Sequence, residues 1–305
     1  MHIVRYVRPE VGSAAAVGVS AGGTVTELTG VAGVGELLRL PAAELRERCA
    51  GAAGPRHDIG ALRLLPPVDG HMEVWAAGVT YRRSREARVV ESERSADVYE
   101  QVYDAARPEL FFKSAAWRVT GDGEKVAVRT DSGIDVPEPE LGLVVNRDAE
   151  IVGYTVVNDM SSRTIEGENP LYLPQAKIYL GGCAVGPAIR PAWEVPDPYD
   201  LDIALTIRRD GADAWTGRAG TRQLRRRFDE LVRYLFHADD FPDGAVLATG
   251  TCLVPDLPFT LLSGDRIVIA IAEIGTLTST VVSGKAEMGW LAAPGRTAKD
   301  GGRTS

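Results

Sequence analysis

Two short apolar segments, residues 138–145 and 151–158, are joined by a polar turn and carry carboxylates at their outer ends. Segments of this length and composition are natural antiparallel strand partners. Glu138 and Glu140 stand two apart at the entry to the first strand, so the alternation of side chains places both on one face. Asp159 closes the second strand. The pattern therefore predicts a hairpin with three carboxylates gathered at one end.

These three carboxylates are a candidate metal site. Held together without partners they would repel one another, and their pKa values would rise. A hard divalent cation relieves that repulsion, and an all-oxygen ligand set favours Mg²⁺, Mn²⁺ or Ca²⁺ over zinc. Spacing alone leaves a second interpretation open, because Glu-x-Glu pairs are common on exposed strands. In that case Glu138, Glu140 and Asp159 would be a solvated acidic strand end.

The composition is that of a globular protein and excludes several classes. The 305 residues are 45% apolar, which is enough for a well-filled core. A formal net charge of −8 argues against nucleic-acid binding, which needs a basic surface. No run reaches the roughly 18 apolar residues of a membrane helix, and no apolar signal core begins the chain. We therefore expect a cytoplasmic protein that binds neither nucleic acid nor membrane, with its three cysteines as small buried residues.

Residues 1–67 are expected to form a small leading α+β domain that ends at a Pro-Pro pair. Residues 16–19 and 24–28 predict a β-hairpin, because two glycines between them supply the turn. A helix over residues 35–50 follows. Residues 18–22 match the G-x-S-x-G pattern of a nucleophile elbow, but that motif needs a helix directly after it. A Thr/Val strand follows here, so we favour the hairpin.

Residues 68–292 are expected to form one larger domain, mostly antiparallel β with a few helices outside it. The expected fold class is thus α+β, mainly β. Helices are predicted over 84–106 and 221–237, and residues 293–305 are expected to be a mobile tail. The predicted strands cover residues 73–79, 110–113, 125–130, 138–145, 151–158, 201–208, 245–253, 265–272 and 276–282.

Several further motifs occur in one order along residues 70–285, and together they resemble the fumarylacetoacetate hydrolase family. The resemblance implies a catalytic domain of the mixed β-sandwich roll type after the smaller N-terminal domain, and a homodimer or homotetramer. It also implies Mg²⁺, or Mn²⁺, held by Glu138, Glu140 and Asp159, on which a small-molecule 2-oxoacid substrate chelates. The motifs are Phe111-Phe-Lys113, Glu138-x-Glu140-Leu, Gly153-Tyr-Thr-Val-Val-Asn-Asp159-Met-Ser-Ser-Arg163, Lys177, Gly186-Pro187, Thr249-Gly-Thr251, Ser263-Gly-Asp265 and Ile274-Gly-Thr-Leu277.

One departure from the family pattern bears on the reaction. Members that cleave carbon–carbon bonds resemble G-x-N-Y-x-x-H-x-x-E at their first motif, where the His/Glu pair activates water. The aligned run starts at Gly78 and has Ser84 in the place of the histidine and Ala87 in that of the glutamate. A serine hydroxyl without a nearby histidine is not a competent base near neutral pH. The run instead resembles the branch that dehydrates 2-keto-3-deoxy sugar acids such as 2-keto-3-deoxy-D-arabinonate to 2,5-dioxopentanoate.

A dehydration of this kind gives further residues their expected roles. The enzyme must remove a proton from C3, hold the enolate and protonate the hydroxyl that leaves C4. Glu109 is the candidate general base or acid, and Lys177 is the candidate for proton transfer or oxyanion support. The candidate substrate-binding residues are Ser84, Phe111, Lys113 and Thr251.

Each role has a structural alternative. Glu109 could form an ion pair with Lys113 or Arg107, Lys177 could be a surface lysine, and the Thr251 hydroxyl could bond its own turn. The alternative activity is a hydrolase of acylpyruvate-like substrates or a decarboxylase of oxaloacetate-like substrates. A third reading is a protein without catalysis, or one reassigned to a larger 2-oxoacid.

Overall fold

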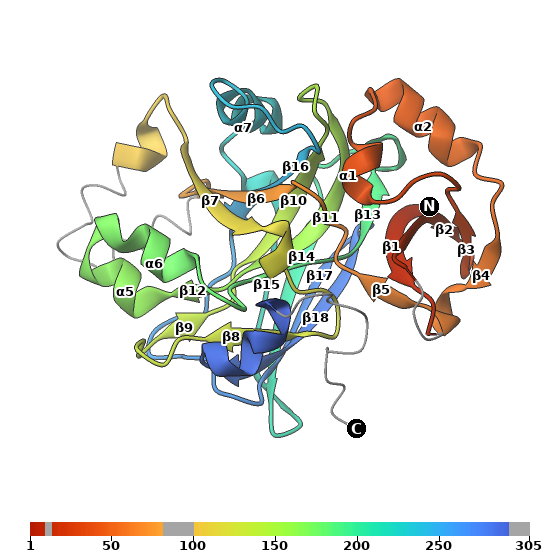
Figure 1. Ribbon diagram of the computed structural model, residues 1–305. Helices are drawn as coiled ribbons and strands as arrows, with labels where there is room; N and C mark the ends of the chain where they lie inside the picture. The colour runs from red at the N-terminus through yellow and green to blue at the C-terminus, as the bar shows by residue number, and fades with distance from the viewer. Residues whose placement is uncertain (10–13, 82–100, 293–305) are drawn as a thin grey trace.

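The structure, a computed structural model, describes residues 1–9, 14–81 and 101–292. In this part of the chain the strands form a large sheet, a second sheet of five strands and a two-stranded ribbon (Figure 1). Short helices lie at the periphery. The expected class, α+β and mainly β, is confirmed. No helix in these three ranges is both long and apolar enough to cross a membrane.

The large sheet runs in the order β4-β3-β2-β1-β13-β11-β10-β16-β6-β7, with β5 also paired to β1. Most neighbours are antiparallel, whereas β16 and β6 are parallel. Its strands are β1 (His2–Val7), β2 (Ala16–Ala21), β3 (Thr24–Glu27), β4 (Arg56–Asp58), β5 (Arg63–Leu65), β6 (Glu73–Gly78), β7 (Glu109–Ala115), β10 (Pro139–Val145), β11 (Ile151–Asp159), β13 (Cys183–Pro191) and β16 (Ala245–Thr251).

The second sheet has the order β15-β14-β17-β18-β8, and the ribbon pairs β9 with β12. Their strands are β8 (Lys125–Val128), β9 (Asp135–Val136), β12 (Ser161–Ser162), β14 (Asp202–Arg209), β15 (Ala212–Gly220), β17 (Arg266–Ile271) and β18 (Gly275–Ser283). The helices are α1 (Val34–Leu37), α2 (Ala42–Ala50), α5 (Arg163–Glu168), α6 (Leu173–Lys177) and α7 (Phe228–Leu235), with short 3₁₀ turns between elements.

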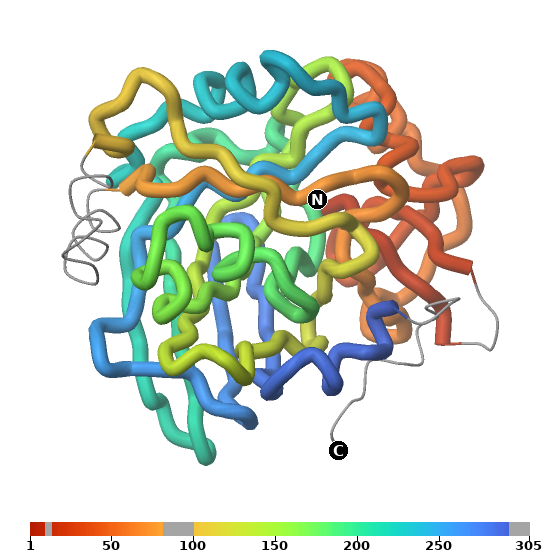
Figure 2. The backbone as a smooth tube through the Cα atoms, turned by 60° about the vertical axis from the view of Figure 1, so that its left-hand side comes forward, coloured from red at the N-terminus to blue at the C-terminus, as the bar shows by residue number. Residues whose placement is uncertain are grey.

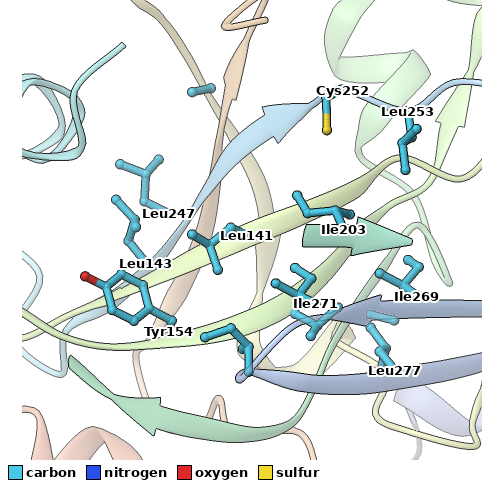
Figure 3. Close-up of a cluster of buried hydrophobic side chains, with 14 of the residues drawn as sticks. Leu141, Leu143, Tyr154, Ile203, Leu247, Cys252, Leu253, Ile269, Ile271 and Leu277 are labelled. Atoms are coloured by element: carbon cyan, nitrogen blue, oxygen red, sulfur yellow. The ribbon is translucent and has the colours of Figure 1, made fainter. Parts of the chain in front are cut away.

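The main core lies between the two sheets. Strands β10 and β16 are buried along their whole length, because both faces of the large sheet are covered. Figure 3 shows leucines of β10 meeting isoleucines of β14 and β17 across this layer. Side chains on the other face of β10, such as Val144, belong to a second cluster under the N-terminal elements. A strand covered on both sides gives the carboxylates at its end a rigid base.

The predicted leading hairpin is confirmed as β2 and β3, and Gly22 and Gly23 between them both have positive φ. Ser20 lies within β2 and is followed by a strand, so it does not form an elbow. The single helix expected over 35–50 is wrong. Pro41 lacks an N–H and starts a new helix, so α1 and α2 are separate. Strand β1 pairs with β13, and the division at residue 67 stays a prediction.

The helix predicted over 221–237 is correct only in its second half. Residues Thr221–Gln223 form a 3₁₀ turn. Leu224 then forms a bridge with Tyr81, and the Arg225 N–H donates to the Thr80 carbonyl at 3.1 Å, so the α-helix cannot start before this pairing ends. The helix α7 begins at Phe228. The helix expected over 84–106 lies outside the described residues except for 101–104, which are helical, and the tail also lies outside them.

Each predicted strand matches an observed one to within a few residues. The prediction missed the longer strands β1 and β13, which pair with each other in the large sheet, and β15, which is largely exposed and has a weak apolar pattern. It also missed the short strands β4, β5, β9 and β12. The three cysteines are buried and carry free thiols, as expected.

Candidate metal centre and its pocket

Five neighbouring strands of the large sheet carry the candidate site residues, or residues paired with them, at the ends that meet along one edge. Asp159 ends β11 beside the start of β10, and Glu140 pairs with Thr251 at the end of β16. Gly78 ends β6 and pairs with Glu109, the first residue of β7. Of the four strand pairs, only β16 and β6 are parallel, and this arrangement brings residues far apart in sequence to the same edge.

The three predicted ligands lie together. Glu138, Glu140 and Asp159 each offer a carboxylate oxygen, and these oxygens lie within 4.8 Å of one another. The residues are 3%, 1% and 1% exposed, respectively, so the alternative of a solvated acidic strand end is wrong. By strand alternation Glu140 shares the face of Val144.

The Glu140 carboxylate is held from one side by the backbone. The Gly250 N–H donates to Glu140 Oε2 at 2.6 Å. Gly250 has φ +92°, and a Cβ atom there would lie 2.0 Å from the Thr80 hydroxyl, so this approach requires glycine. Burial, followed by the negative charges of Asp159 and Glu138, raises the pKa of Glu140 well above its usual value. A bound cation would relieve this destabilisation.

Lys177 is the first of three cations around the triad. Its Nζ donates to Glu138 Oε2 at 2.8 Å, Asp159 Oδ2 at 3.1 Å and Ser161 Oγ at 2.5 Å. The residue is 2% exposed, so the alternative of a surface lysine is wrong. Its Nζ also lies 5.7 Å from the centre of the Phe111 ring. Lys177 therefore fixes two of the three carboxylates relative to each other.

Lys113 contacts Asp159, one of the two carboxylates that Lys177 also holds. Its Nζ forms an ion pair with Asp159 and donates to the carbonyl oxygens of Met160 at 2.9 Å and Lys177 at 2.5 Å. An ammonium has three N–H groups, and these three oxygens use all of them. We therefore infer that Lys113 positions Asp159, and not the substrate as expected from the sequence.

Arg163 is the third cation, and it links the triad to Glu166, a carboxylate that is not among the predicted site residues. Its Nη2 lies 3.2 Å from Glu138 Oε1, and its Nη1 lies 3.8 Å from Glu166 Oε2. Both residues belong to α5, whose first turn is capped by the Ser162 hydroxyl. The sequence signal was available, because Glu166 stands one helical turn after Arg163 in the segment that follows Asp159.

A pocket opens over the triad, and side chains from both the sheet and the helices form its walls. Glu109 lines it and lies against Gly78, where a Cβ atom would be only 2.1 Å from Glu109 Oε2. Thr251 also lines it, but its hydroxyl donates to the Leu253 carbonyl at 3.0 Å, as its structural alternative expected. Ser84 lies outside the described residues. The other polar or aromatic lining residues are Phe111, Glu138, Glu140, Asp159, Glu166 and Lys177.

The donor set fits a hard divalent cation. Three buried carboxylates supply only oxygen atoms, which Mg²⁺ and Mn²⁺ prefer, and within the described part of the chain no thiol or imidazole joins the cluster. Lys113, Lys177 and Arg163 orient the carboxylates from outside, as supporting residues do in metal sites. The arrangement can bind a cation that in turn holds an anionic or carbonyl oxygen in the pocket.

Comparisons with known proteins identify two relatives with similar sequences. One is a probable 2-keto-3-deoxyxylonate dehydratase of Haloferax volcanii, 51% identical over 71% of this chain and 74% of its own. Another is the 2-dehydro-3-deoxy-D-arabinonate dehydratase of Saccharolobus solfataricus, 44% identical over 73% of this chain and 76% of its own.

A solved structure extends the comparison to nearly the whole fold. It is a 2-keto-3-deoxy-D-arabinonate dehydratase complexed with magnesium and 2,5-dioxopentanoate, 35% identical, with a TM-score of 0.79. The match covers 93% of this chain and 99% of the other. Residues 73–282 also match the family model described as fumarylacetoacetate (FAA) hydrolase C-terminal. This chain belongs to the fumarylacetoacetate hydrolase family.

Proposed function

We propose that this protein is a magnesium-dependent hydro-lyase that removes water from a 2-keto-3-deoxy sugar acid. The proposed substrate is 2-keto-3-deoxy-D-arabinonate, and the products are 2,5-dioxopentanoate and water. The observation that carries the proposal is the buried triad Glu138, Glu140 and Asp159, on a fold similar along 93% of the chain to a dehydratase complexed with magnesium and this product. The named dehydratase relatives favour this activity over the hydrolase or decarboxylase alternative.

Glu138, Glu140 and Asp159 would hold the Mg²⁺, or Mn²⁺, through carboxylate oxygens. When bound, the cation would polarise the 2-oxo group of the substrate and so acidify the hydrogens on C3. The surrounding ammonium and guanidinium groups keep the three carboxylates in place before the substrate arrives. Such preorganised charge costs no rearrangement during the reaction.

The geometry supports different roles for the two predicted catalytic residues, Lys177 and Glu109. Lys177 donates to two ligand carboxylates and to Ser161, so we assign it to positioning and electrostatic support. Glu109 lines the pocket from the first position of β7, and a pocket carboxylate outside the ligand triad can act as a general acid or base, so we keep this role for it. Phe111 and Thr251 form pocket walls that would contact the substrate, and the same role for Ser84 stays a prediction.

The expected homodimer or homotetramer and the cytoplasmic location are also proposals. The subunit number can be measured directly by size-exclusion chromatography with light scattering on the full-length protein. A monomer at micromolar concentration would contradict the oligomer that the family resemblance implies.

The test of the activity is turnover by the magnesium-loaded protein. We expect 2-keto-3-deoxy-D-arabinonate to lose one water, as followed by mass spectrometry, and the Glu138→Gln variant to lose this activity because it lacks one ligand charge. Absence of turnover by wild-type protein with magnesium demonstrably bound would reject this substrate. Release of two carbon fragments from an acylpyruvate, or of carbon dioxide from oxaloacetate, would support the alternative activity instead.

A further inference from the structure

Residues 224–226, just before α7, contact two parts of the chain that lie far away in sequence. The first is the end of β6. Leu224 forms a bridge with Tyr81, and the Arg225 N–H donates to the Thr80 carbonyl at 3.1 Å. These contacts hold the chain where it leaves β6 beside the pocket.

The second part is the segment that leads into β7, and the side chain of Arg226 holds it. The guanidinium donates to the carbonyl oxygens of Val102 at 3.4 Å, Ala105 at 2.6 Å and Ala106 at 3.5 Å. It also donates to Glu230 Oε1 at 2.9 Å. The Arg226 side chain is only 10% exposed, so protein shields these contacts from water. In Figure 2 the yellow segment that enters β7 lies beside the cyan segment that begins α7.

Further contacts join the same two segments. The Tyr234 hydroxyl donates to the Ala106 carbonyl at 3.3 Å, and the Arg107 guanidinium lies 5.2 Å from the centre of the Tyr234 ring. Arg225 forms an ion pair with Asp104, but their side chains are 40% and 69% exposed. An exposed pair contributes only about 0–1 kcal/mol, so the buried guanidinium is the stronger point of attachment.

Arginine is well suited to this position. Residues 101–104 are helical, and the last carbonyl groups of a helix lack partners within the helix. A guanidinium carries five N–H groups in one plane, so one side chain can donate to several of these carbonyls and still hold Glu230. The contact therefore fixes the end of this helical turn in one orientation.

The attachment lies close to a residue of the pocket. Glu109 comes three positions after Ala106, and Pro108 between them restricts the backbone. Glu109 is the first residue of β7, lines the pocket and lies against Gly78. The strand begins there, so the direction in which the chain enters β7 depends on where Ala106 is held.

We propose that Arg226 is a positioning residue that keeps Glu109 in place for its acid/base role. The inference rests on the proposed function. Arg226 is not among the described residues that line the pocket, so its effect on the reaction passes through residues 102–108. A misplacement of about 1 Å caused by a distant substitution can cost about 10²-fold in rate.

The test is a kinetic double-mutant cycle of Arg226→Gln and Glu109→Gln. We expect Arg226→Gln to lower kcat for 2-keto-3-deoxy-D-arabinonate about 10²-fold, with Mn²⁺ affinity, measured by electron paramagnetic resonance, unchanged. Glu109→Gln alone should cost about 10²–10⁴-fold, as loss of a general acid or base does. If Arg226 acts through Glu109, the double variant should be as active as Glu109→Gln alone. A purely structural loss would lower the rate by the same factor in both backgrounds.

A second measurement follows the segment without substrate. In hydrogen–deuterium exchange with mass spectrometry, the amides of residues 102–107 should exchange faster in Arg226→Gln than in wild type. The matched control is Arg222→Gln, which removes an exposed guanidinium that pairs with Asp200 and Asp202. It should keep both the wild-type exchange and the wild-type kcat. Arg226→Lys keeps the charge with fewer donors, so its kcat should lie between those of wild type and Arg226→Gln.

The inference is overturned if Arg226→Gln has the wild-type kcat, or if its amides at residues 102–107 exchange as in wild type. It is also overturned if the double variant is about 10²-fold slower than Glu109→Gln, since Arg226 would then act independently of Glu109. Failure of the proposed function has a different signature. In that case wild type does not dehydrate the sugar acid, while Arg226→Gln still exchanges faster at residues 102–107. The cycle is then run on the release of carbon fragments or carbon dioxide, with the same two outcomes.

Discussion

Replacing Lys113 by methionine would test how the centre is held together. The substitution removes a buried ammonium and keeps most of the side-chain volume. Asp159 then loses an ion-pair partner, and the carbonyls of Met160 and Lys177 lose a donor. Removing one partner of a buried ion pair costs about 3–5 kcal/mol when the other charge stays buried without compensation. Because Lys177 still pairs with Asp159, we expect a loss at the lower end of that range, about 3 kcal/mol, in the free energy of unfolding without divalent ions.

The measurement is equilibrium unfolding in urea with and without Mg²⁺. Added Mg²⁺ should recover part of the loss, because a cation that binds only the folded state stabilises it and would replace the missing positive charge. The matched control is Lys125→Met, whose Nζ lies 3.3 Å from Glu287 with side chains 28% and 54% exposed. Such a surface pair contributes about 0–1 kcal/mol. A Lys113→Met protein as stable as the Lys125→Met protein would refute the assignment of Lys113 as a support of Asp159.

Three further predictions follow from the site and its surroundings. Gly78→Ala should lower dehydratase activity about 10²-fold with little change in Mg²⁺ affinity, because the new Cβ displaces the Glu109 carboxylate. The control Gly289→Ala adds a Cβ in open space and should be neutral, so equal rates for the two variants would contradict this prediction. Burial raises the pKa of Asp135 to about 6, so the folded protein binds this proton more tightly than the unfolded chain does, and stability should fall as pH rises from about 4 to 6. Asp135→Asn removes this effect, so the free energy of unfolding of the variant in urea should rise by about 1–3 kcal/mol relative to wild type between those pH values. A variant-minus-wild-type difference that stays constant with pH would be evidence against the prediction. Removal of divalent ions with a chelator should lower the melting temperature, and Mg²⁺ at about 100 times its dissociation constant should restore about 2.7 kcal/mol in wild type but not in Glu140→Gln.

The sequence was sufficient to predict that the three carboxylates lie together, because their placement depends on strand periodicity, whereas their role as metal ligands was implied by the family resemblance. Alternation along residues 138–145 and the antiparallel partner at 151–158 put three carboxylates at one end of a hairpin, and β10 and β11 have this arrangement. No knowledge of the other elements was needed. Glu109 was also found, because it opens a strand next to a distinctive Phe-Phe-Lys motif.

The supporting contacts depend on tertiary structure and could not be predicted. Nothing in the sequence around Lys113 shows that its ammonium reaches Asp159 on another strand. Glu166 was missed because a carboxylate on a short polar helix looks like a solvated one until the helix covers a pocket. The local errors have physical causes too, since Pro41 split one predicted helix and the pairing of Leu224 with Tyr81 shortened another.

The most direct test of the central claim follows the carbon skeleton. Uniformly ¹³C-labelled 2-keto-3-deoxy-D-arabinonate would be added to the magnesium-loaded protein and observed by ¹³C NMR, with Glu138→Gln as the control. The structure and its relatives predict that all five carbons stay joined, that C5 becomes an aldehyde or its hydrate, and that the control shows no change. Cleavage into smaller fragments, release of labelled carbon dioxide or equal turnover by Glu138→Gln would contradict a metal-dependent dehydratase.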